Sequence, residues 1–598
     1  MYPAALLLAV VLPFEAIPPV FASLSDEKLV LLLLAATWLL LGVRALPTRD
    51  EARALVPTVG LVLVALVSAV LAPDFGDEAL RFVWRLAILV FVMLVSLRLA
   101  RDPARATGLL WAIVVGGGLS AALGLAETLG WSTLEPLFKL FKVAPTRVGG
   151  ELRVSASFQY ATIAAMYFEM VAPLAVVLAA TTRRYWLRLM AVAVAALCTA
   201  DVVLSLTRAG AVTLLVVYAI LLGASLSSAS WRRLREPTLV GMATLVGGSA
   251  LLLARNPVVD LRLVTESDAD WYGAAYSAPA SLEVASGGST GVSLEVRNQG
   301  RITWVSSGPH PFALGYRWLS ADGMQVLDVP LTEVTLPHDV SPGESVQLQT
   351  SVHVPNLPAG TYRIDWGMLQ RDVLQFYERG WADAETRVQV GPSPDGAPAS
   401  PPSMTLRDDG EAPWVVGRMY LWTAALHMIE LHPLLGVGPD NFRHFYGAEL
   451  GLETWDERVQ ANNLYLEILA DLGVLGLAAF AWVIARPLAL SVRLFRSPAQ
   501  QPAAYLRLGA GAALVAFLVH GLADSFLAFT PTALLLWMML GLLWVPSGVR
   551  TRRSQGADRR ADAGGGAAPG GSCRSPGGSA MSWRRGGRSG GRRAGPGW

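Results

Sequence analysis

The chain has 598 residues, of which 53% are hydrophobic and only 16% are charged, whereas soluble proteins carry about 25% charged residues. This composition predicts an integral membrane protein with many spans. A formal net charge of +2 on so long a chain gives no indication of nucleic-acid binding. The two cysteines exclude a disulfide framework and a cysteine-rich metal site. We therefore expect the lipid bilayer, and no nucleic acid, among the partners.

Apolar runs of the length that crosses about 30 Å of hydrocarbon recur toward both ends of the chain. They lie near residues 4–22, 27–43, 55–72, 81–99, 106–128, 159–180, 186–206, 209–228, 237–254, 463–484, 506–528 and 531–546. About twelve transmembrane helices are therefore expected. The first run lacks a basic n-region and a small-residue cleavage site, so we interpret it as a retained span.

Clusters of arginine set the expected threading of these spans. They lie near residues 44–53, 98–105, 183–188, 232–235, 486–496 and 550–553. If every run crosses once, all clusters fall on one side, which the positive-inside bias assigns to the cytoplasm. We therefore expect a multi-pass protein of the cytoplasmic (inner) membrane with both termini cytoplasmic and with residues 255–462 on the extracytoplasmic side.

A change of pattern indicates a soluble domain inside this large loop. Segments such as "GVSLEVRN" and "SVQLQTSVHV" alternate apolar and polar residues between turn signals, which predicts a small antiparallel, Ig-like β-sandwich. The expected fold is therefore an all-α polytopic membrane protein with an inserted extracytoplasmic β-sandwich. Four tryptophans of this insert either stack on sugar rings or form its core: Trp304, Trp318, Trp366 and Trp381.

The expected organisation follows from these boundaries. It comprises a membrane domain of about nine spans at 1–254, a linker at 255–278, the sandwich at 279–391, a Pro-rich linker at 392–416, an amphipathic extracytoplasmic loop at 417–462, three C-terminal spans at 463–549, and a disordered Arg/Gly-rich cytoplasmic tail at 550–598.

Ionisable residues inside predicted spans indicate a functional site by default, because burying charge in lipid is costly. Glu15 and Glu169 lie about halfway through their runs, and His520 and Asp524 lie one helical turn apart near the outer end of another. The simplest interpretation is an outward-open polar cavity. The alternative is a set of buried ion pairs that only fix helix packing.

Arginines near the outer face are candidates for binding an anion. Arg208 stands at the apex of the turn "SLTRAG", where a guanidinium can bind phosphate oxygens bidentately; alternatively, it reaches to lipid headgroups. Further cations are Arg147 and Arg153 in "TRVGGELRVSASFQY", and Arg418 in "GRMYLWTAALHMIELHPLLGVGPDNF". The apolar stripe after Arg418 predicts a helix lying on the membrane: Met419, Leu421, Trp422, Leu426 and Ile429.

The end of this loop, "HPLLGVGPDNF", and the following "NNLYLEILADLGVLG" resemble the O-antigen ligase and polymerase (Wzy-type) family of polytopic glycosyltransferases. The family signature is His, then Asn, Ser or Gln, then nine residues and Gly-x-x-Gly. The chain matches it from Asn463 through Gly473 and Gly476. "SLTRAG" is similar to the family's Ser-x-Ser-Arg turn, and "RVSASFQYATIAAMYFEMVAPLA" is similar to the loop that leads into a middle span.

The resemblance implies transfer of a glycan from a polyprenyl-diphosphate carrier, such as undecaprenyl diphosphate, to a hydroxyl of a glycan or glycolipid acceptor, in polysaccharide biosynthesis at the cell envelope. It implies no metal and no other cofactor, so arginines would stabilise the leaving diphosphate. Arg208 and Arg418 match the family's arginines in position. We expect the remaining binding residues to be Arg147, Arg153, Asn463 and His432, and the structural glycines to be Gly436, Gly438, Gly473 and Gly476.

One position departs from the signature. Asn462 stands where the family has its histidine, and an amide cannot accept a proton near neutral pH. We expect catalytic roles for Arg208, Asn462 and Glu467, with Glu467 or a histidine of the loop as the base. The loop histidines are His427, His432 and His444. The alternative for Glu467 is a carboxylate that caps a helix start.

Three other functions remain open at this stage. A polysaccharide polymerase of the same family would use the same donor. A solute transporter would also have about twelve spans with polar residues in the membrane, although no internal repeat is evident. A non-catalytic glycan-assembly protein would explain Asn462 and would leave the lipid-linked glycan unconsumed.

Overall fold

We describe a computed structural model of the chain, which covers residues 1–14, 16, 26–41, 49–129, 131–265, 268–393, 403–406, 416–496 and 502–544. Glu15 and the predicted disordered tail at 550–598 lie outside the described residues.

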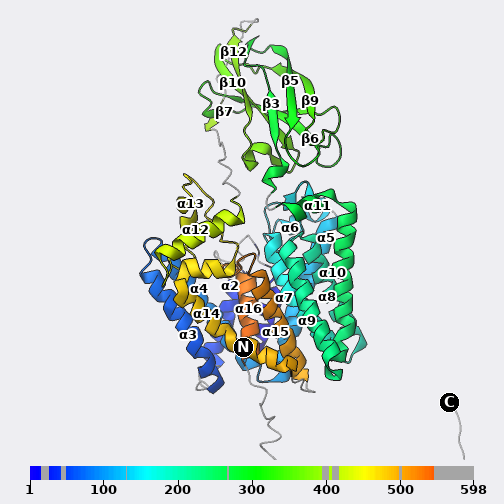
Figure 1. Ribbon diagram of the computed structural model, residues 1–598, viewed down its shortest axis with the longest axis vertical. Coiled ribbons are helices and arrows are strands. Elements are labelled where there is room, and N and C mark those ends of the chain that lie inside the picture. Colours follow the sequence, from blue (N-terminus) through cyan, green and yellow to red (C-terminus); the bar gives the residue numbers. More distant parts are fainter. Residues whose placement is uncertain are drawn as a thin grey trace, which may run out of the picture. The chain divides into compact units, whose positions relative to one another are not determined.

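Apolar helices make up about half of the described chain (Figure 1). Nine stretches among the described residues are long and apolar enough to cross a membrane, and three further apolar helices are shorter. The sequence predicted about twelve spans, and the length and composition of the described helices support nine. The helices are α1 (Tyr2–Val11), α2 (Asp26–Leu41), α3 (Arg49–Val70), α4 (Gly76–Leu99), α5 (Pro103–Leu129), α7 (Ala161–Thr181), α8 (Tyr185–Leu204), α9 (Arg208–Ser227), α10 (Arg235–Arg255), α14 (Leu464–Arg496), α15 (Pro502–His520) and α16 (Thr530–Leu543).

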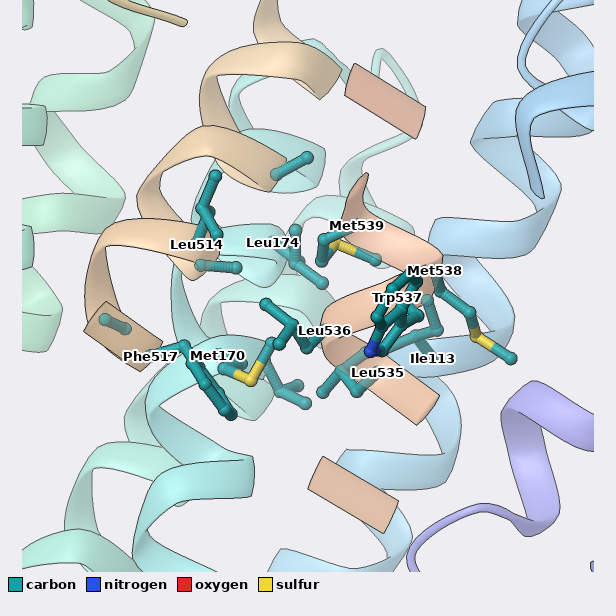
Figure 2. Close-up of a cluster of buried hydrophobic side chains, with 14 of the residues drawn as sticks. Ile113, Met170, Leu174, Leu514, Phe517, Leu535, Leu536, Trp537, Met538 and Met539 are labelled. Atoms are coloured by element: carbon teal, nitrogen blue, oxygen red, sulfur yellow. The ribbon is translucent and has the colours of Figure 1, made fainter. Parts of the chain in front are cut away.

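Helix α7 is the central element of this bundle. Its residues from Ile163 to Ala180 are all buried, because it is apolar on every side and packs against α5, α8, α9 and α15. Figure 2 shows side chains from several of these helices meeting around it, and one more helix, α16, contributes Trp537. Glu169 is therefore held in the middle of a dry apolar core.

Helix α14 is interrupted at Gly473, where φ is 65° and ψ is −170°. The segment before Asp440 runs beside the interruption: the N–H of Val437 donates to the carbonyl of Ala470 at 2.9 Å, and the N–H of Val474 donates to the carbonyl of Pro433 at 2.9 Å. A Cβ at Gly473 would lie 2.2 Å from the carbonyl carbon of Leu434. Only glycine allows this positive φ and this close approach together.

The strands form two sheets between α10 and α12. The smaller sheet has the order β3 (Ala274–Ser277), β5 (Ser289–Asn298), β9 (Ser345–His353). The larger follows the order β13 (Met404–Leu406), β7 (Gln325–Leu327), β6 (Phe312–Leu319), β10 (Gly360–Gln370), β12 (Ala384–Gly391), β4 (Ser281–Ala285), with β8 (Thr332–Thr335) and β11 (Leu374–Gln375) beside this path. β12 pairs with β4 in parallel, so the prediction of an antiparallel sandwich is wrong at this pair, where the two strands run in the same direction.

The tryptophans of this region form its core rather than a sugar-binding face. Trp304, Trp318 and Trp366 are 0%, 2% and 0% exposed. The Trp366 indole donates to Thr386 at 2.9 Å, and the Trp381 indole donates to the carbonyl of Ala269 at 2.9 Å. The first three cannot stack on a sugar without unfolding the sheet.

Both predicted linkers contain regular structure. Within 255–278 lie β3 and α11 (Pro257–Val264), whose start is capped by the Asn256 side chain with proline in the first turn. Within 392–416, β13 extends the larger sheet by pairing with β7. These elements are too short to show a periodicity in the sequence, so the linker prediction missed them.

Helix α12 (Arg418–Leu431) packs on the protein through a face that shares only Leu421 with the predicted apolar stripe. Its buried residues are Leu421, Ala424, Ala425 and Met428, whereas Met419 and Leu426 are 61% and 51% exposed. The alanines allow close packing against α14. The short helix α13 (Phe442–Glu449) follows. Two further small elements precede α7, namely the helix α6 (Trp131–Phe138) and the hairpin of β1 (Arg147–Val148) and β2 (Glu151–Leu152).

Candidate functional site

Three arginines converge on the turn between α8 and α9. Arg153 donates through Nε to the carbonyl of Ser205 at 3.0 Å, and Arg262 donates through Nε to the carbonyl of Leu206 at 2.9 Å. Leu206 itself has a left-handed φ of 53°. Arg208 is the first residue of α9, and its Nη1 donates to the carbonyl of Thr265 at 2.9 Å. Three guanidinium groups are thus gathered at one helix start, where the backbone N–H groups add positive potential.

The charges of this cluster act on one another. Burial lowers the pKa of Arg153 to about 9, and repulsion from Arg262 and Arg208 contributes, while Asp268 and Asp524 oppose the shift. The Nη2 atom of Arg153 is buried and has no hydrogen-bond partner among the described residues. Such an excess of buried positive charge is costly unless an anion binds there.

Arg418 belongs to the same electrostatic neighbourhood, although it lies far away in sequence. Burial lowers the pKa of Arg262, and repulsion from Arg208 and Arg418 adds to the effect. Arg418 also interacts electrostatically with His520 and Asp524. The start of α12 therefore faces the end of α15 and the turn at Arg208.

A histidine–carboxylate pair lies beside this cluster. His520, the last residue of α15, places Nδ1 at 3.0 and 2.9 Å from the two carboxylate oxygens of Glu169. His520 is 1% exposed and Glu169 is 0% exposed. A Cβ at Gly210, two residues after Arg208, would lie 2.6 Å from Glu169 Oε1. The small residue at this position allows the carboxylate to reach the first turn of α9.

The signature segment lies next to His520. Asn462 has a left-handed φ of 50°, and its side chain makes no hydrogen bond within the described part of the chain. Asn463 caps α14: its Oδ1 accepts from the N–H groups of Tyr465 and Leu466 at 3.0 and 3.1 Å, and its Nδ2 donates to the carbonyl of Leu522 at 3.1 Å. The Asn463 side chain is therefore engaged in joining α14 to the loop after α15.

Glu467 is buried one turn further along α14. Its carboxylate accepts from the backbone N–H of Ala461 at 3.0 Å and from the Ser525 hydroxyl at 2.8 Å. These bonds fix the turn at Asn462 and match the capping alternative for Glu467. They also leave this carboxylate less available as a base.

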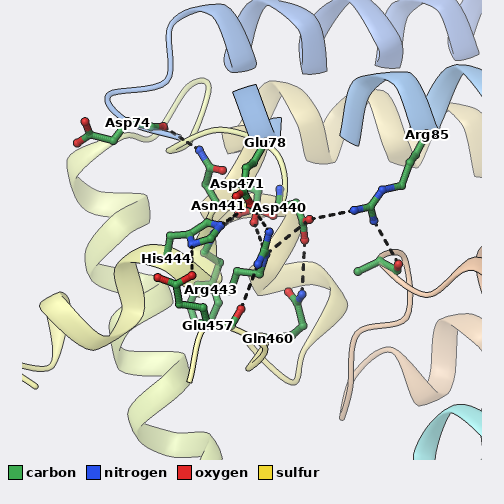
Figure 3. Close-up of polar contacts among 12 residues, drawn as sticks. Asp74, Glu78, Arg85, Asp440, Asn441, Arg443, His444, Glu457, Gln460 and Asp471 are labelled. Carbon is green, nitrogen blue, oxygen red and sulfur yellow. Dashed lines mark hydrogen bonds and ion pairs between the residues drawn. The ribbon is translucent and has the colours of Figure 1, made fainter. Parts of the chain in front are cut away.

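A second polar network holds α13 against α4 and α14 (Figure 3). The Asp471 carboxylate accepts from the N–H groups of Asp440 and Phe442 at 2.9 and 2.8 Å. His444 lies between Glu78, 2.8 Å from Nε2, and Glu457, 3.2 Å from Nδ1. These groups anchor the loop that carries the signature; Nε2 of His444 is hydrogen-bonded to Glu78, whereas its buried Nδ1 has no hydrogen-bond partner among the described residues.

The other residues predicted for the site make their contacts outside the arginine cluster. Arg147 donates to the carbonyl of Gly150 within its own hairpin at 2.9 Å. His432 ends α12 and is exposed. His427 bonds to Glu449 on the same surface. Gly436 and Gly438 have φ values of 68° and 110°, as their turn against α14 requires.

Sequence reasoning missed Arg262 as a site residue, because it falls in the expected linker. It also left His520 and Glu169 without assigned roles, although both were noted as ionisable residues in spans. Their separation of 351 residues hides the pairing from any local motif. Among the described residues, no group of three or more His, Cys, Asp or Glu side chains is arranged to hold a metal ion.

The fold and the site define a polytopic membrane protein with an arginine-rich polar site where α9, α12, α14 and α15 approach one another. Residues 373–481 match the model of the O-antigen ligase family. This match confirms the resemblance predicted from the signature. A comparison with curated proteins gives no match.

Proposed function

We propose that this chain is a membrane glycosyltransferase that moves a glycan from a polyprenyl-diphosphate carrier to an acceptor hydroxyl on the outer side of the cytoplasmic membrane. The O-antigen ligase domain supports membrane glycan processing in general. The proposal of a polyprenyl-diphosphate donor rests on the three arginines around the turn at 205–208.

The chemistry of a diphosphate leaving group matches this cluster. As the bond between the anomeric carbon and the diphosphate breaks, negative charge develops on the leaving oxygen. Preorganised guanidinium groups in a partly dry site stabilise that charge without reorganising. In the proposed complex, Arg153, Arg208 and Arg262 bind the diphosphate, and Arg418 closes the site from α12.

The orientation in the membrane follows from the arginine bias and is part of the proposal. Both termini and the arginine-rich connections lie in the cytoplasm, and the sandwich and α12 lie outside. The donor then presents its diphosphate to the cluster from the outer leaflet.

The direct test is reconstitution of the full chain in lipid vesicles with a lipid-linked glycan and a hydroxyl-bearing glycolipid acceptor. Release of polyprenyl diphosphate together with a glycan–acceptor product supports a ligase. Growth of the glycan on the lipid carrier instead supports the polymerase of the same family. No consumption of donor with either acceptor contradicts the proposed function and leaves the transporter and assembly-protein alternatives.

A further inference from the structure

The structure narrows the search for the base that Asn462 cannot provide. The chain has seven histidines, and all of them lie in the described residues. His310, His338 and His353 belong to the sandwich region. His427 and His432 are exposed on the surface of α12, and His444 belongs to the separate network that holds α13, where it lies between Glu78 and Glu457. His520 is the one that remains.

The geometry of His520 is that of an oriented base. Its Nδ1 faces the Glu169 carboxylate at 2.9 and 3.0 Å, so the neutral ring carries its proton on Nδ1 and has a lone pair on Nε2. Nε2 is buried and has no hydrogen-bond partner among the residues that the structure describes. An unsatisfied buried polar atom costs about 1–3 kcal/mol, and a substrate hydroxyl that donates to Nε2 would remove this cost.

His520 also lies at the junction of the two motifs that carry the family resemblance. On one side, the Leu464 N–H donates to the carbonyl of Gly521 at 2.8 Å, and Ser525 bonds to Glu467. These contacts attach the residue after His520 to the start of α14. On the other side, Glu169 contacts the first turn of α9 at Gly210.

We propose that His520, oriented by Glu169, is the general base that replaces the histidine missing at position 462. This inference rests on the proposed function. Nε2 takes the proton of the acceptor hydroxyl while the hydroxyl oxygen forms its bond to the anomeric carbon. The bond from that carbon to the diphosphate breaks, and the electron pair leaves with the polyprenyl diphosphate. The proton on His520 then passes to water as the products leave.

The test compares variants of the full chain in the reconstituted transfer assay. His520→Gln should lower kcat by about 10²-fold or more, which is the usual contribution of a general base, with a small change in KM. His338→Gln, at an exposed histidine of the sandwich region, is the matched control and should transfer at the parental rate. Adding Asn462→His to His520→Gln should restore part of the lost activity, because it returns an imidazole to the family's position. A merely structural role for His520 would not give this rescue.

Two further measurements test the role of His520 even if the variant His520→Gln does not fold. The double variant Glu169→Gln/His520→Gln removes the buried carboxylate charge together with the imidazole. It therefore folds even if an unpaired Glu169 carboxylate would unfold the single variant. Its kcat should fall by the same factor as that of His520→Gln. In the unaltered protein, kcat should rise with pH across one ionisation between about pH 5 and 8. Glu169 from α7, Asp524 from the loop after α15, and Arg418 from α12 are the charged groups that set its midpoint.

The outcomes separate the two claims. Full transfer by either variant, or a rate that does not change with pH over this range, overturns the role of His520 while the proposed function stands. An unaltered protein that consumes no lipid-linked glycan overturns both.

Discussion

The conformation of Asn462 limits what can replace it. With a φ of 50°, the residue lies in the left-handed region, where Asn, Asp and His occur more often than other side chains and β-branched residues are strained. A histidine, as in the family signature, fits the same backbone. The exchange at this position therefore changes the chemistry of the site and leaves its main-chain path intact.

The first prediction concerns this backbone. Asn462→His should unfold at the parental denaturant concentration, and Asn462→Val should lose about 1–2 kcal/mol of unfolding free energy because of its β-branched side chain. Unfolding of the detergent-solubilised chain, followed by tryptophan fluorescence, measures both. Equal stability of the valine variant would show that the turn at Asn462 can relax.

The second prediction concerns a buried ion pair near the site. Lys142 donates to Glu127 at 2.6 Å and to Ser155 at 2.7 Å, and the two charged side chains are 1% and 0% exposed. Burial lowers the pKa of Lys142, and attraction to Glu127 opposes this. Lys142→Met would leave a buried carboxylate unpaired, so we expect a loss of about 3–5 kcal/mol of unfolding free energy.

A matched control lies one turn earlier. Lys139 pairs with Glu135 at 2.8 Å, with 61% and 40% of the side chains exposed, and Lys139→Met should change stability by less than about 1 kcal/mol. Similar losses for the two variants would show that Lys142 is not paired in a dry environment.

At the scale of elements, the interruption of α14 explains the Gly-x-x-Gly part of the signature. Gly473 opens the helix, and the freed backbone groups of α14 pair with the segment that carries Gly436 and Gly438. The Asp471 carboxylate then caps the start of α13. One broken helix thereby fixes the loop that presents Asn462.

The third prediction tests this interruption. Gly473→Ala places a Cβ 2.2 Å from the carbonyl carbon of Leu434, so we expect a loss of more than about 2 kcal/mol, as strain and overpacking combine. Gly223→Ala in α9 is the control, because its Cβ meets nothing within 4 Å and alanine favours a helix by about 1 kcal/mol. A Gly473→Ala protein as stable as the control variant would contradict the described packing.

Several elements follow from the sequence because their signals are local. Apolar runs of sufficient length predict the long helices, such as α7 and α14, and alternation predicts long strands such as β5 and β9. Short elements such as α11, β3 and β13 depend on a cap or on a strand partner, so no periodicity reveals them. The face by which α12 packs against α14 was not predicted, because its alanines do not stand out in a hydrophobic stripe.

At the scale of the whole molecule, the fourth prediction concerns topology. A reporter fused near residue 395 should be active outside the cytoplasmic membrane, and one fused after residue 550 should be active in the cytoplasm, since the arginine clusters favour the cytoplasmic side. Alkaline phosphatase and fluorescent-protein fusions distinguish the two compartments. Finding both reporters in one compartment would contradict the threading and the placement of the site.

The candidate site was only partly predictable from the sequence, because only some of its residues stand in local motifs. Arg208 and Arg153 stand in recognisable motifs, and the structure brings them to one turn. Arg262 joins them through α11, and His520 meets Glu169 through helix packing. Such convergence depends on tertiary structure, which a single sequence without an alignment does not reveal.

The central claim is that the arginines at the turn bind the carrier diphosphate, and Arg208→Lys tests it most directly. Lysine keeps the charge but loses the planar fork, so kcat in the vesicle assay should fall by about 10²-fold or more. Arg458→Lys, in a side chain that pairs with Asp456 and is 74% exposed, is the control and should transfer at the parental rate. We expect this loss in a variant whose unfolding temperature matches that of the parental protein; parental transfer by Arg208→Lys would contradict diphosphate binding at the turn.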